Sequence, residues 1–146
     1  MDALEIAAEL CKRFEGFRSR PYLCPAGVAT IGYGSVRYPD GSAVTLFDAP
    51  ITRERAAELL LSDLRRSRLP AVLQLCPGAD TPERIAALVD FAYNLGTGAL
   101  RSSTLRKRVN AGSWEAVPVE LRKWVRGGGR VLPGLVRRRD AEAALV

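Results

Sequence analysis

In the stretch "RFEGFRSRPYLCPAGVATIGYG", residues 13–34, a helical sequence pattern ends at the third residue and a strand-like pattern follows. Before that point, residues 2–14 carry apolar side chains at helical spacing, and Asp2 and Glu5 stand at the spacing of a capping box. Gly16 ends the helical pattern, and turn residues then alternate with β-branched and aromatic ones, which is typical of short strands. The stretch therefore predicts a helix that ends beside a small sheet, with one carboxylate, Glu15, at the junction.

The rest of the sequence predicts first the remainder of this sheet and then a series of helices. Short β-like pieces run from Arg20 to about Val44 and are broken by the turns "CPAG" and "YPDG". Thr52 caps a predicted helix over 53–69, Thr81 with Pro82 opens another over 83–95, and Gly96 ends it. Three shorter helices are predicted near 103–110, 113–125 and 134–145, separated by "NAGS" and a flexible "RGGGRVLPG". This order predicts an α+β fold in which the sheet faces a helical bundle across a cleft.

The composition limits the class of protein. A chain of 146 residues with 47% hydrophobic and 26% charged residues is sized for one domain, expected over residues 1–146. No apolar run reaches the length of a membrane span, and the first residues do not read as a signal peptide. There is no histidine, and the three cysteines lack metal-ligand spacing. We therefore expect no metal site, no cofactor and no nucleophile paired with histidine.

Positive charge is concentrated at the C-terminal end. Residues 101–146 hold 11 Lys and Arg against 4 Asp and Glu, whereas residues 1–100 hold 11 against 12. This asymmetry indicates an anionic partner, and nucleic acid, an acidic membrane surface and an acidic wall polymer all satisfy it. Because no zinc finger, aromatic RNA-binding strand or clear helix-turn-helix is visible, nucleic acid is not the expected partner.

Glu15 is the candidate for chemistry. Next to Phe14 and Phe17 its carboxyl group would be partly desolvated, and burial favours the neutral, proton-carrying form of an acid. Such an acid can protonate a glycosidic oxygen, provided that a second group positions water on the other face of the sugar. Cys24 and Thr30 are the nearest polar candidates. The alternative is a structural ion pair between Glu15 and an arginine of 137–139, and the two roles are compatible.

The spacing of these three residues resembles a known catalytic signature. Eight residues separate Glu15 from Cys24, and five residues separate Cys24 from Thr30. This spacing is similar to the pattern of the phage-type lysozymes, the endolysins of glycoside hydrolase family 24. The segments "FEGFRSRPYLCPAGVATIGYG", "ALVDFAYNLGTGALRSSTLRKRVNAG" and "GGGRVLPGLVRRRDAE" resemble the same family in the same order. The resemblance implies a lysozyme-like fold, with an N-terminal helix and a small antiparallel sheet packed on a helical bundle.

The resemblance also implies an activity and roles for residues. The activity is that of a muramidase, which cuts the β-1,4 bond between N-acetylmuramic acid and N-acetylglucosamine in peptidoglycan, with an inverting outcome. Glu15 would be the general acid and Thr30 would hold the attacking water, while Cys24 stands where many relatives have Asp. A thiol is mostly neutral at pH 7, so the identity of the base stays open. The substrate-binding residues would be Gly32, Gly34, Ser103, Thr104 and Arg138.

Partners and location follow from the same resemblance. The substrate would be peptidoglycan glycan strands, with added attraction to anionic outer-membrane or wall polymers and no nucleic acid. The enzyme would accumulate in the host cytoplasm as a monomer and reach the periplasm after a separate holin opens the membrane. Two alternatives stay open: a lytic transglycosylase acting on the same bond, and an inactive basic domain that binds cell wall or nucleic acid.

Overall fold

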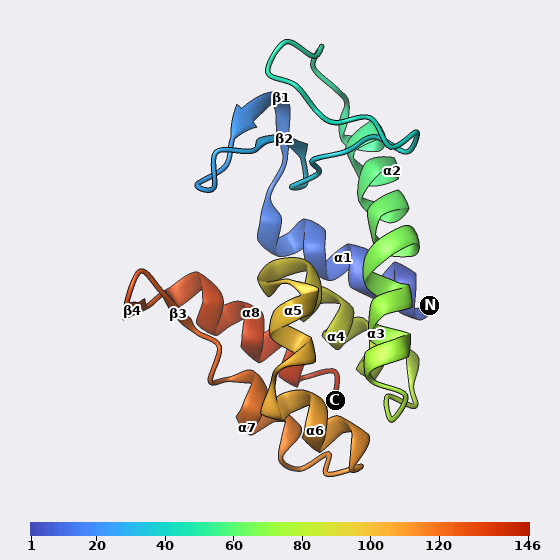
Figure 1. Ribbon diagram of the computed structural model, residues 1–146, viewed down its shortest axis with the longest axis vertical. Helices are drawn as coiled ribbons and strands as arrows, with labels where there is room; N and C mark the ends of the chain where they lie inside the picture. Colours follow the sequence, from blue (N-terminus) through green and yellow to red (C-terminus); the bar gives the residue numbers. More distant parts are fainter.

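The computed structural model describes residues 1–146 and has the expected α+β architecture (Figure 1). Helix α1 (Ala3–Glu15) leads into an antiparallel hairpin, β1 (Arg18–Leu23) and β2 (Ala29–Gly32), and β2 packs against the helix at Arg53–Asp63. The remaining elements are α2 (Arg53–Asp63), the π-helix η1 (Leu64–Arg68), α3 (Leu69–Leu75), α4 (Pro82–Leu95), α5 (Thr97–Arg101), α6 (Thr104–Asn110), α7 (Val117–Leu121), β3 (Arg126–Gly127), β4 (Arg130–Val131) and α8 (Pro133–Ala143).

The first helix forms as its sequence predicts. The Asp2 side chain accepts a hydrogen bond from the Glu5 backbone N–H at 2.8 Å, so it satisfies one of the free donors at the helix start. The buried side chains Ala7, Ala8, Leu10 and Cys11 form one face of the helix. Gly16 then adopts a φ of 74°, a conformation that other residues rarely take, and α1 ends there. Its last residue is Glu15.

The sheet is smaller than the expected range from Arg20 to Val44. The β1–β2 ladder starts at Arg18 and ends at Gly32, and only isolated bridges join Ile31 to Ser35 and Arg37 to Ala43. Positive φ angles at Gly32 and Gly34 turn the chain twice within three residues. An extended strand cannot continue through such turns, so the β-like piece "SAVTLF" pairs at one residue only.

The long helix extends beyond its expected end at residue 69. Elements α2, η1 and α3 run without a break from residue 53 to residue 75, with Pro70 in the first turn of α3. In η1 the Leu69 N–H donates to the Leu64 carbonyl, five residues back. Because a proline ring clashes with the carbonyl four residues before it, the wider π turn accommodates Pro70 where a regular α-helix would kink.

Helix α4 lies at the centre of the helical part and contacts α1, α3, α5 and α8. Thr81 caps it by accepting from the Arg84 N–H at 3.1 Å, and Gly96 ends it, as predicted. Trp124 packs edge-on against Phe91, with 5.4 Å between ring centroids, which supports a core role for this tryptophan. No helix in the structure combines the length and apolar character that crossing a bilayer requires.

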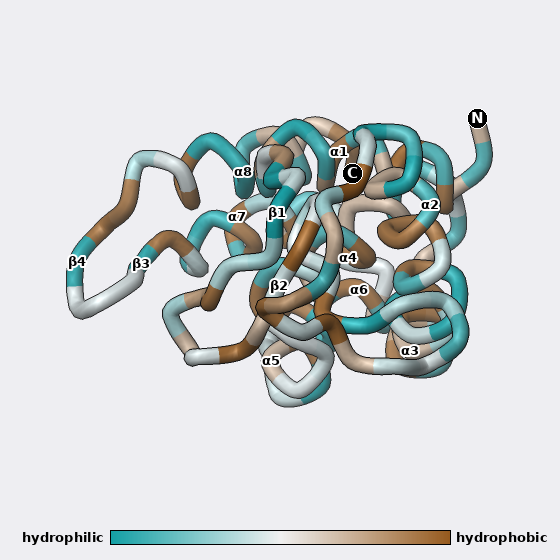
Figure 2. Tube along the Cα trace, turned by 90° about the horizontal axis from the view of Figure 1, so that it is seen from above, coloured by the Kyte–Doolittle hydropathy of each residue, from teal (hydrophilic) through white to brown (hydrophobic).

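Three features of the C-terminal third differ from the prediction. Helix α5 was not expected, α7 is shorter than the range 113–125, and the glycine-rich segment forms the hairpin β3–β4. Figure 2 shows this hairpin projecting from the body of the molecule. Since α5 and α7 have only five residues each, tertiary packing rather than local periodicity forms them.

Candidate active site

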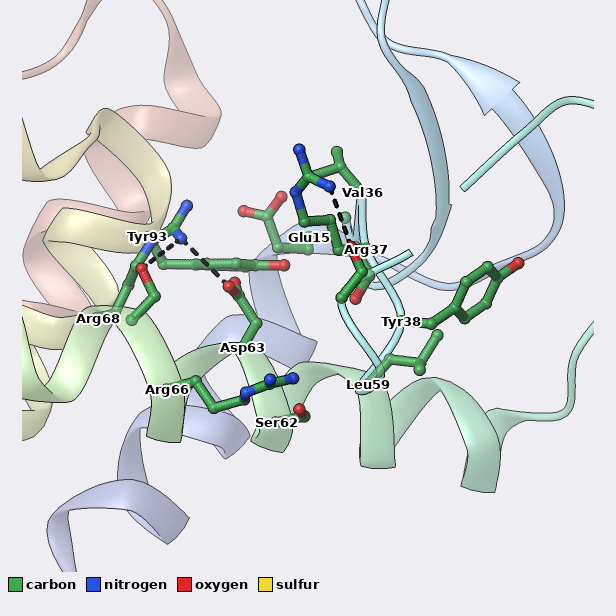
Figure 3. A pocket seen from close by; sticks show the side chains of 14 residues that line it. Glu15, Val36, Arg37, Tyr38, Leu59, Ser62, Asp63, Arg66, Arg68 and Tyr93 are labelled. Atoms are coloured by element: carbon green, nitrogen blue, oxygen red, sulfur yellow. Dashed lines mark hydrogen bonds and ion pairs between the residues drawn. The ribbon is translucent and has the colours of Figure 1, made fainter. Parts of the chain in front are cut away.

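Glu15 lies between two depressions of the surface. Its side chain is 25% exposed and lines a cavity of about 450 Å³ bounded by the segment after β2, by α2 with η1, and by Tyr93 of α4 (Figure 3). A second, more open groove of about 770 Å³ adjoins Glu15 on the side of α8 and is lined by Phe14, Asn94 and Leu132 among others. An extended ligand that crosses the junction of the two would therefore contact this carboxylate.

An arginine from the far end of the chain holds Glu15. The Arg138 Nη1 group in α8 donates to Glu15 Oε2 and forms an ion pair with it. Arg138 is only 4% exposed, so water screens the pair weakly. The ion pair between Glu15 and an arginine of 137–139, raised as the alternative role of this acid, is thus present, and Arg138 is the partner.

Asp90 of α4 fixes the orientation of this arginine. Arg138 Nε donates to Asp90 Oδ2 at 2.9 Å and Nη2 donates to Oδ1 at 2.8 Å, a bidentate pair. Cys11 in α1 adds a hydrogen bond from Sγ to Oδ1 at 3.2 Å. Burial alone would raise the pKa of Asp90, but the hydrogen bonds from Arg138 outweigh it and hold that pKa below its usual value. Asp90 is therefore the ionised, fully buried anchor of the arginine.

A second buried pair continues this network toward the C-terminus. Arg139 Nη2 donates to Asn94 Oδ1 at 2.6 Å and to Glu142 Oε2 at 3.0 Å, and neither Arg139 nor Glu142 is exposed. Burial and the neighbouring Asp90 raise the pKa of Glu142 well above its usual value. Helices α4 and α8 are thus joined by polar side chains directly behind the Glu15 ion pair.

The sequence reasoning missed Asp90, although a signal was present. The residue stands alone as a carboxylate within the apolar run "ALVDFAYNL", and ionisable residues are rarely fully buried unless they are paired. An acid in the middle of an apolar helix therefore predicts a buried cationic partner. The sequence alone does not say which of the many arginines fills that role.

Thr30 and Cys24 lie together on the hairpin. Thr30 of β2 is 3% exposed, and its hydroxyl donates to the Val28 carbonyl at 2.9 Å. Cys24 follows β1 and has a lowered thiol pKa, chiefly because it accepts a hydrogen bond from the Val28 backbone. Burial opposes this effect, while the backbone of Ala26 and the Thr30 side chain add to it. The turn thus favours the thiolate, the form of cysteine that acts as a base or nucleophile.

Tyr22 connects the hairpin with Glu15. It stands opposite Thr30 in the β1–β2 register. Burial raises the pKa of Tyr22, the nearby Arg18 guanidinium opposes this, and the negative charges of Glu15 and Cys24 raise it further. The Tyr22 phenol therefore lies within electrostatic reach of both negative groups.

The two predicted glycines have different surroundings. A Cβ atom on Gly34 would lie 3.1 Å from the Tyr93 hydroxyl oxygen and 3.3 Å from Glu15 Oε1, so the missing side chain leaves room for the carboxylate. Gly34 also lines the cavity. A Cβ on Gly32 would instead meet the Cβ of Ala56 in α2 at 3.0 Å. Gly32 therefore permits close packing of the sheet on α2, and only Gly34 adjoins Glu15.

Gly34→Ala should lower activity more than its strain alone explains. Gly34 has a φ of 93°, so alanine there is strained by about 1–2 kcal/mol, and its methyl group would displace Glu15 or Tyr93. Gly112→Ala is the matched control, because Gly112 has a φ of 70° and nothing near its missing Cβ. Both variants should lose similar stability in urea unfolding, with the activity loss confined to Gly34→Ala. Equal activity of the Gly34→Ala and Gly112→Ala variants would show that Gly34 is needed only for its backbone conformation.

Ser103 and Thr104 lie elsewhere. Ser103 is the N-cap of α6: its hydroxyl donates to the Leu100 carbonyl at 2.7 Å and accepts from the Arg106 N–H at 3.0 Å. Thr104 is the first residue of α6. Neither lines the two depressions that adjoin Glu15. Of the predicted site residues, Glu15, Gly34 and Arg138 line the two depressions, whereas Cys24, Thr30 and Gly32 on the hairpin line neither of them.

Comparison with known proteins finds a matching family model and similar solved structures. The family described as Phage lysozyme matches residues 12–142. An endolysin of Acyrthosiphon pisum secondary endosymbiont phage 1 is 35% identical over 141 residues, which cover 93% of this chain and 91% of that protein. The solved endolysin of Escherichia coli O157:H7 phage FAHEc1 superposes with a TM-score of 0.85 at 33% identity, covering 99% of this chain and 92% of the other.

Another relative is considerably longer. The endolysin of Bacillus phage B103 is 38% identical over 147 residues, which cover 99% of this chain but 54% of that protein. The chain therefore spans about half the length of this relative. The lysozyme-like fold is shared along the full length of the described chain.

Proposed function

The chain belongs to the phage lysozyme family, and from this we propose that it is an endolysin that hydrolyses the β-1,4 bond between N-acetylmuramic acid and N-acetylglucosamine in peptidoglycan. The observation that carries the proposal is the Glu15 carboxyl group, held by Arg138 at the edge of a cavity, in a chain whose β1–β2 hairpin carries Thr30 and Cys24. Glycoside hydrolysis needs these two parts, a positioned acid and a group that handles water.

In the proposed first step, Glu15, after taking up a proton from solvent, donates that proton to the glycosidic oxygen. The bond between that oxygen and the anomeric carbon breaks, the oxygen leaves as a hydroxyl, and positive charge develops on the sugar. The Arg138 guanidinium then stabilises the carboxylate that remains on Glu15. Since Asp90 holds Arg138 by two hydrogen bonds, the acid keeps its position through the reaction.

In the proposed second step, a water molecule attacks the anomeric carbon. Thr30 would orient this water, and the Cys24 thiolate would accept its proton or stabilise the positive charge. The lowered pKa of Cys24 supports this role, because it increases the fraction of thiolate near neutral pH. An inverting outcome requires room for water between the two groups, about 6.5–9.5 Å in known enzymes.

Digestion of purified peptidoglycan, with mass analysis of the products, tests the proposed reaction. Hydrolysis leaves reducing N-acetylmuramic acid ends, whereas a lytic transglycosylase leaves 1,6-anhydro ends. Absence of released fragments would contradict any cleavage. Proton NMR of the first products, before mutarotation, reads the stereochemistry, and α-anomeric ends are expected for inversion.

Cys24 variants should separate a chemical role from a packing role. If the thiolate takes part in the reaction, activity rises with pH through the Cys24 ionisation, at a pH below that for an ordinary cysteine. Cys24→Asp should then keep activity and extend it to lower pH. Cys24→Ser should lose most activity, because a hydroxyl does not ionise in this range. The measurement is the initial rate of peptidoglycan cleavage from pH 5 to 9, with folding checked by circular dichroism.

Cys76→Ser is the control for loss of a thiol, because Cys76 is buried away from the hairpin. It should leave the pH profile of cleavage unchanged. Indistinguishable profiles for wild type and Cys24→Ser would contradict the chemical role and leave Thr30 as the group that handles water.

The proposed setting is the lysis of an infected bacterium. We infer synthesis in the host cytoplasm, release by a separate holin and action on the wall in the periplasm. The formal charge of +6 would favour approach to anionic outer-membrane or wall polymers at low salt. The enzyme would act as a monomer.

A further inference from the structure

The buried charges behind Glu15 do not balance. The guanidinium groups of Arg138 and Arg139 meet three carboxyl groups, those of Glu15, Asp90 and Glu142. Apart from Glu15, all of these side chains are almost or completely buried. With every group ionised, the cluster would carry one excess negative charge, and an unbalanced charge is costly to bury. One of the three carboxyl groups should therefore hold a proton.

Asp90 is held as a carboxylate. Its Oδ1 atom accepts hydrogen bonds from Cys11 Sγ and Arg138 Nη2, and its Oδ2 atom accepts one from Arg138 Nε. Hydrogen bonds from a cation favour the ionised form of an acid. A carboxylate offers about four acceptor positions, so these three bonds leave one position open, on Oδ2.

Glu142 lacks such support. Its Oε2 atom accepts a hydrogen bond from Arg139 Nη2 at 3.0 Å, whereas its buried Oε1 atom has no hydrogen-bond partner, although Arg139 Nε is 2.9 Å away. Asp90 lies within hydrogen-bonding reach of Glu142. Two ionised carboxylates repel each other at this range, but a neutral carboxylic acid donates to a carboxylate. The unpaired oxygen of Glu142 and the open acceptor position of Asp90 therefore point to a shared proton.

We propose that Glu142 is a neutral carboxylic acid in the folded protein at neutral pH and donates a hydrogen bond to Asp90, and that it is thereby a positioning residue for Glu15. Glu142 completes the hydrogen bonds of Asp90, and Asp90 orients the arginine that holds Glu15. The two guanidinium groups are then balanced by Asp90 and Glu15. Only the link to Glu15 rests on the proposed function, whereas the proton on Glu142 does not.

A neutral Glu142 does not leave Arg139 without partners. Arg139 Nη2 also donates to Asn94 Oδ1 at 2.6 Å. Its guanidinium carbon lies 5.3 Å from the centre of the Phe91 ring, where a cation is attracted to the aromatic face. The carbonyl oxygen of a neutral carboxyl group still accepts the hydrogen bond from Arg139.

The helices packed against α8 offer Glu142 no further positive charge. These are α1, α4 and α7, and the ionisable side chains that they bury are Cys11, Asp90 and Glu120. Cys11 donates to Asp90, and Glu120 is paired with Lys123 at 2.9 Å. Burial has the largest effect and raises the pKa of Glu142, Asp90 raises it further, and the two arginines of α8 only partly oppose the rise.

Glu142→Gln and Asp90→Asn should behave oppositely in urea unfolding at pH 7. The amide of glutamine has the shape of the neutral acid and keeps a donor and an acceptor, so Glu142→Gln should need at least as much urea as wild type. Asp90→Asn removes an ionised group and should unfold at much lower urea. If Glu142 were the ionised partner of Arg139, its amide would leave a buried cation unpaired. Destabilisation of Glu142→Gln, or its failure to fold, would therefore overturn the proposal.

The pH dependence of unfolding gives a second reading. Glutamate in the unfolded chain releases its proton near pH ~4.3, so above that pH folding of the wild type takes up a proton at Glu142. This contribution to stability is lost as the pH rises toward the raised pKa of Glu142 in the folded protein. The ratio of folded to unfolded wild type, relative to that of Glu142→Gln, should therefore fall by up to about tenfold per pH unit. Parallel curves for the two proteins would contradict a protonated Glu142.

Infrared spectroscopy detects the proton directly. The C=O stretching band of a protonated carboxyl group should be present in folded wild type at pH 7 and absent from Glu142→Gln. Glu120→Gln is the matched control, because Glu120 is also buried but is paired with Lys123, and it should keep the band. The same band in Glu142→Gln would place the proton on another residue and refute the proposal.

Kinetics test the link to Glu15. Glu142→Leu offers no donor to Asp90, so its kcat on soluble peptidoglycan fragments should fall about tenfold with KM unchanged, whereas the conservative Glu142→Gln should restore the rate. Glu142→Met gives the same reading if the leucine variant does not fold. Equal kcat values for the leucine and glutamine variants would overturn the positioning role. Absence of cleavage by wild type would instead contradict the proposed function, and the infrared and unfolding results would still decide where the proton lies.

Discussion

Glu15→Gln is expected to lower the rate of peptidoglycan cleavage by at least about 100-fold while the protein stays folded. The amide has nearly the shape of the acid, and it can still accept a hydrogen bond from Arg138, but it has no proton to donate to a leaving oxygen. The rate of release of reducing ends from purified peptidoglycan measures the loss directly. Circular dichroism and urea unfolding would show that the fold persists.

Glu9→Gln is the matched control for this experiment. Glu9 lies in the same helix, and its ion pair with Lys12 at 3.3 Å is exposed, so the same chemical change should affect neither rate nor stability measurably. If Glu15→Gln retained activity within a few fold of wild type, another group would have to supply the proton. The proposed mechanism would then be wrong, whatever the family of the protein.

Asp90→Asn is expected to destabilise the protein by about 3–5 kcal/mol. The substitution removes the charge from the buried partner of Arg138 and turns an amide N–H₂ toward a guanidinium that can only donate. Arg138 is 4% exposed and has little access to water as a substitute. For a chain of this length the loss corresponds to a fall of roughly 10 °C in Tm. Urea unfolding followed by circular dichroism gives the free energy.

Asp140→Asn provides the comparison for Asp90→Asn. Asp140 pairs with Arg122 at 3.0 Å, but both side chains are more than half exposed, so the loss should be below about 1 kcal/mol. Folded Asp90→Asn protein should also cleave more slowly than wild type, because Arg138 no longer holds Glu15 in one orientation. Similar unfolding free energies for the two variants would refute the role of Asp90 as the buried anchor.

Local chemistry predicted much of the fold. Asp2, Thr52 and Thr81 cap helices α1, α2 and α4 as their side chains suggest, because an N-cap bond joins groups only three residues apart. The continuation through Pro70 was not predictable in the same way, since a π turn departs from the helical pattern that sequence periodicity describes. Helix α5 and the hairpin β3–β4 are also too short to carry a periodic signal.

In the candidate site too, residues that are close in the sequence were predictable, whereas partners that are distant in the sequence were not. Glu15, Cys24 and Thr30 stand close together in the sequence, and their spacing indicated a common role. The partner of Glu15 is 123 residues away, and Asp90, which orients that partner, lies on a third element. Such a network depends on how α1, α4 and α8 pack against one another. A single sequence fixes the chemical types of these residues but not which of them meet.

The environments of the three cysteines also make the chain suited to selective chemical labelling. Burial raises the pKa of Cys11 and of Cys76, the latter to about 11, and both side chains are inaccessible. Cys24 alone is partly exposed with a lowered pKa. A maleimide dye at neutral pH should therefore attach at one position, next to Thr30, without any engineered substitution. If the proposed function is right and glycan strands contact the hairpin, the fluorescence of the dye should change when peptidoglycan fragments are added.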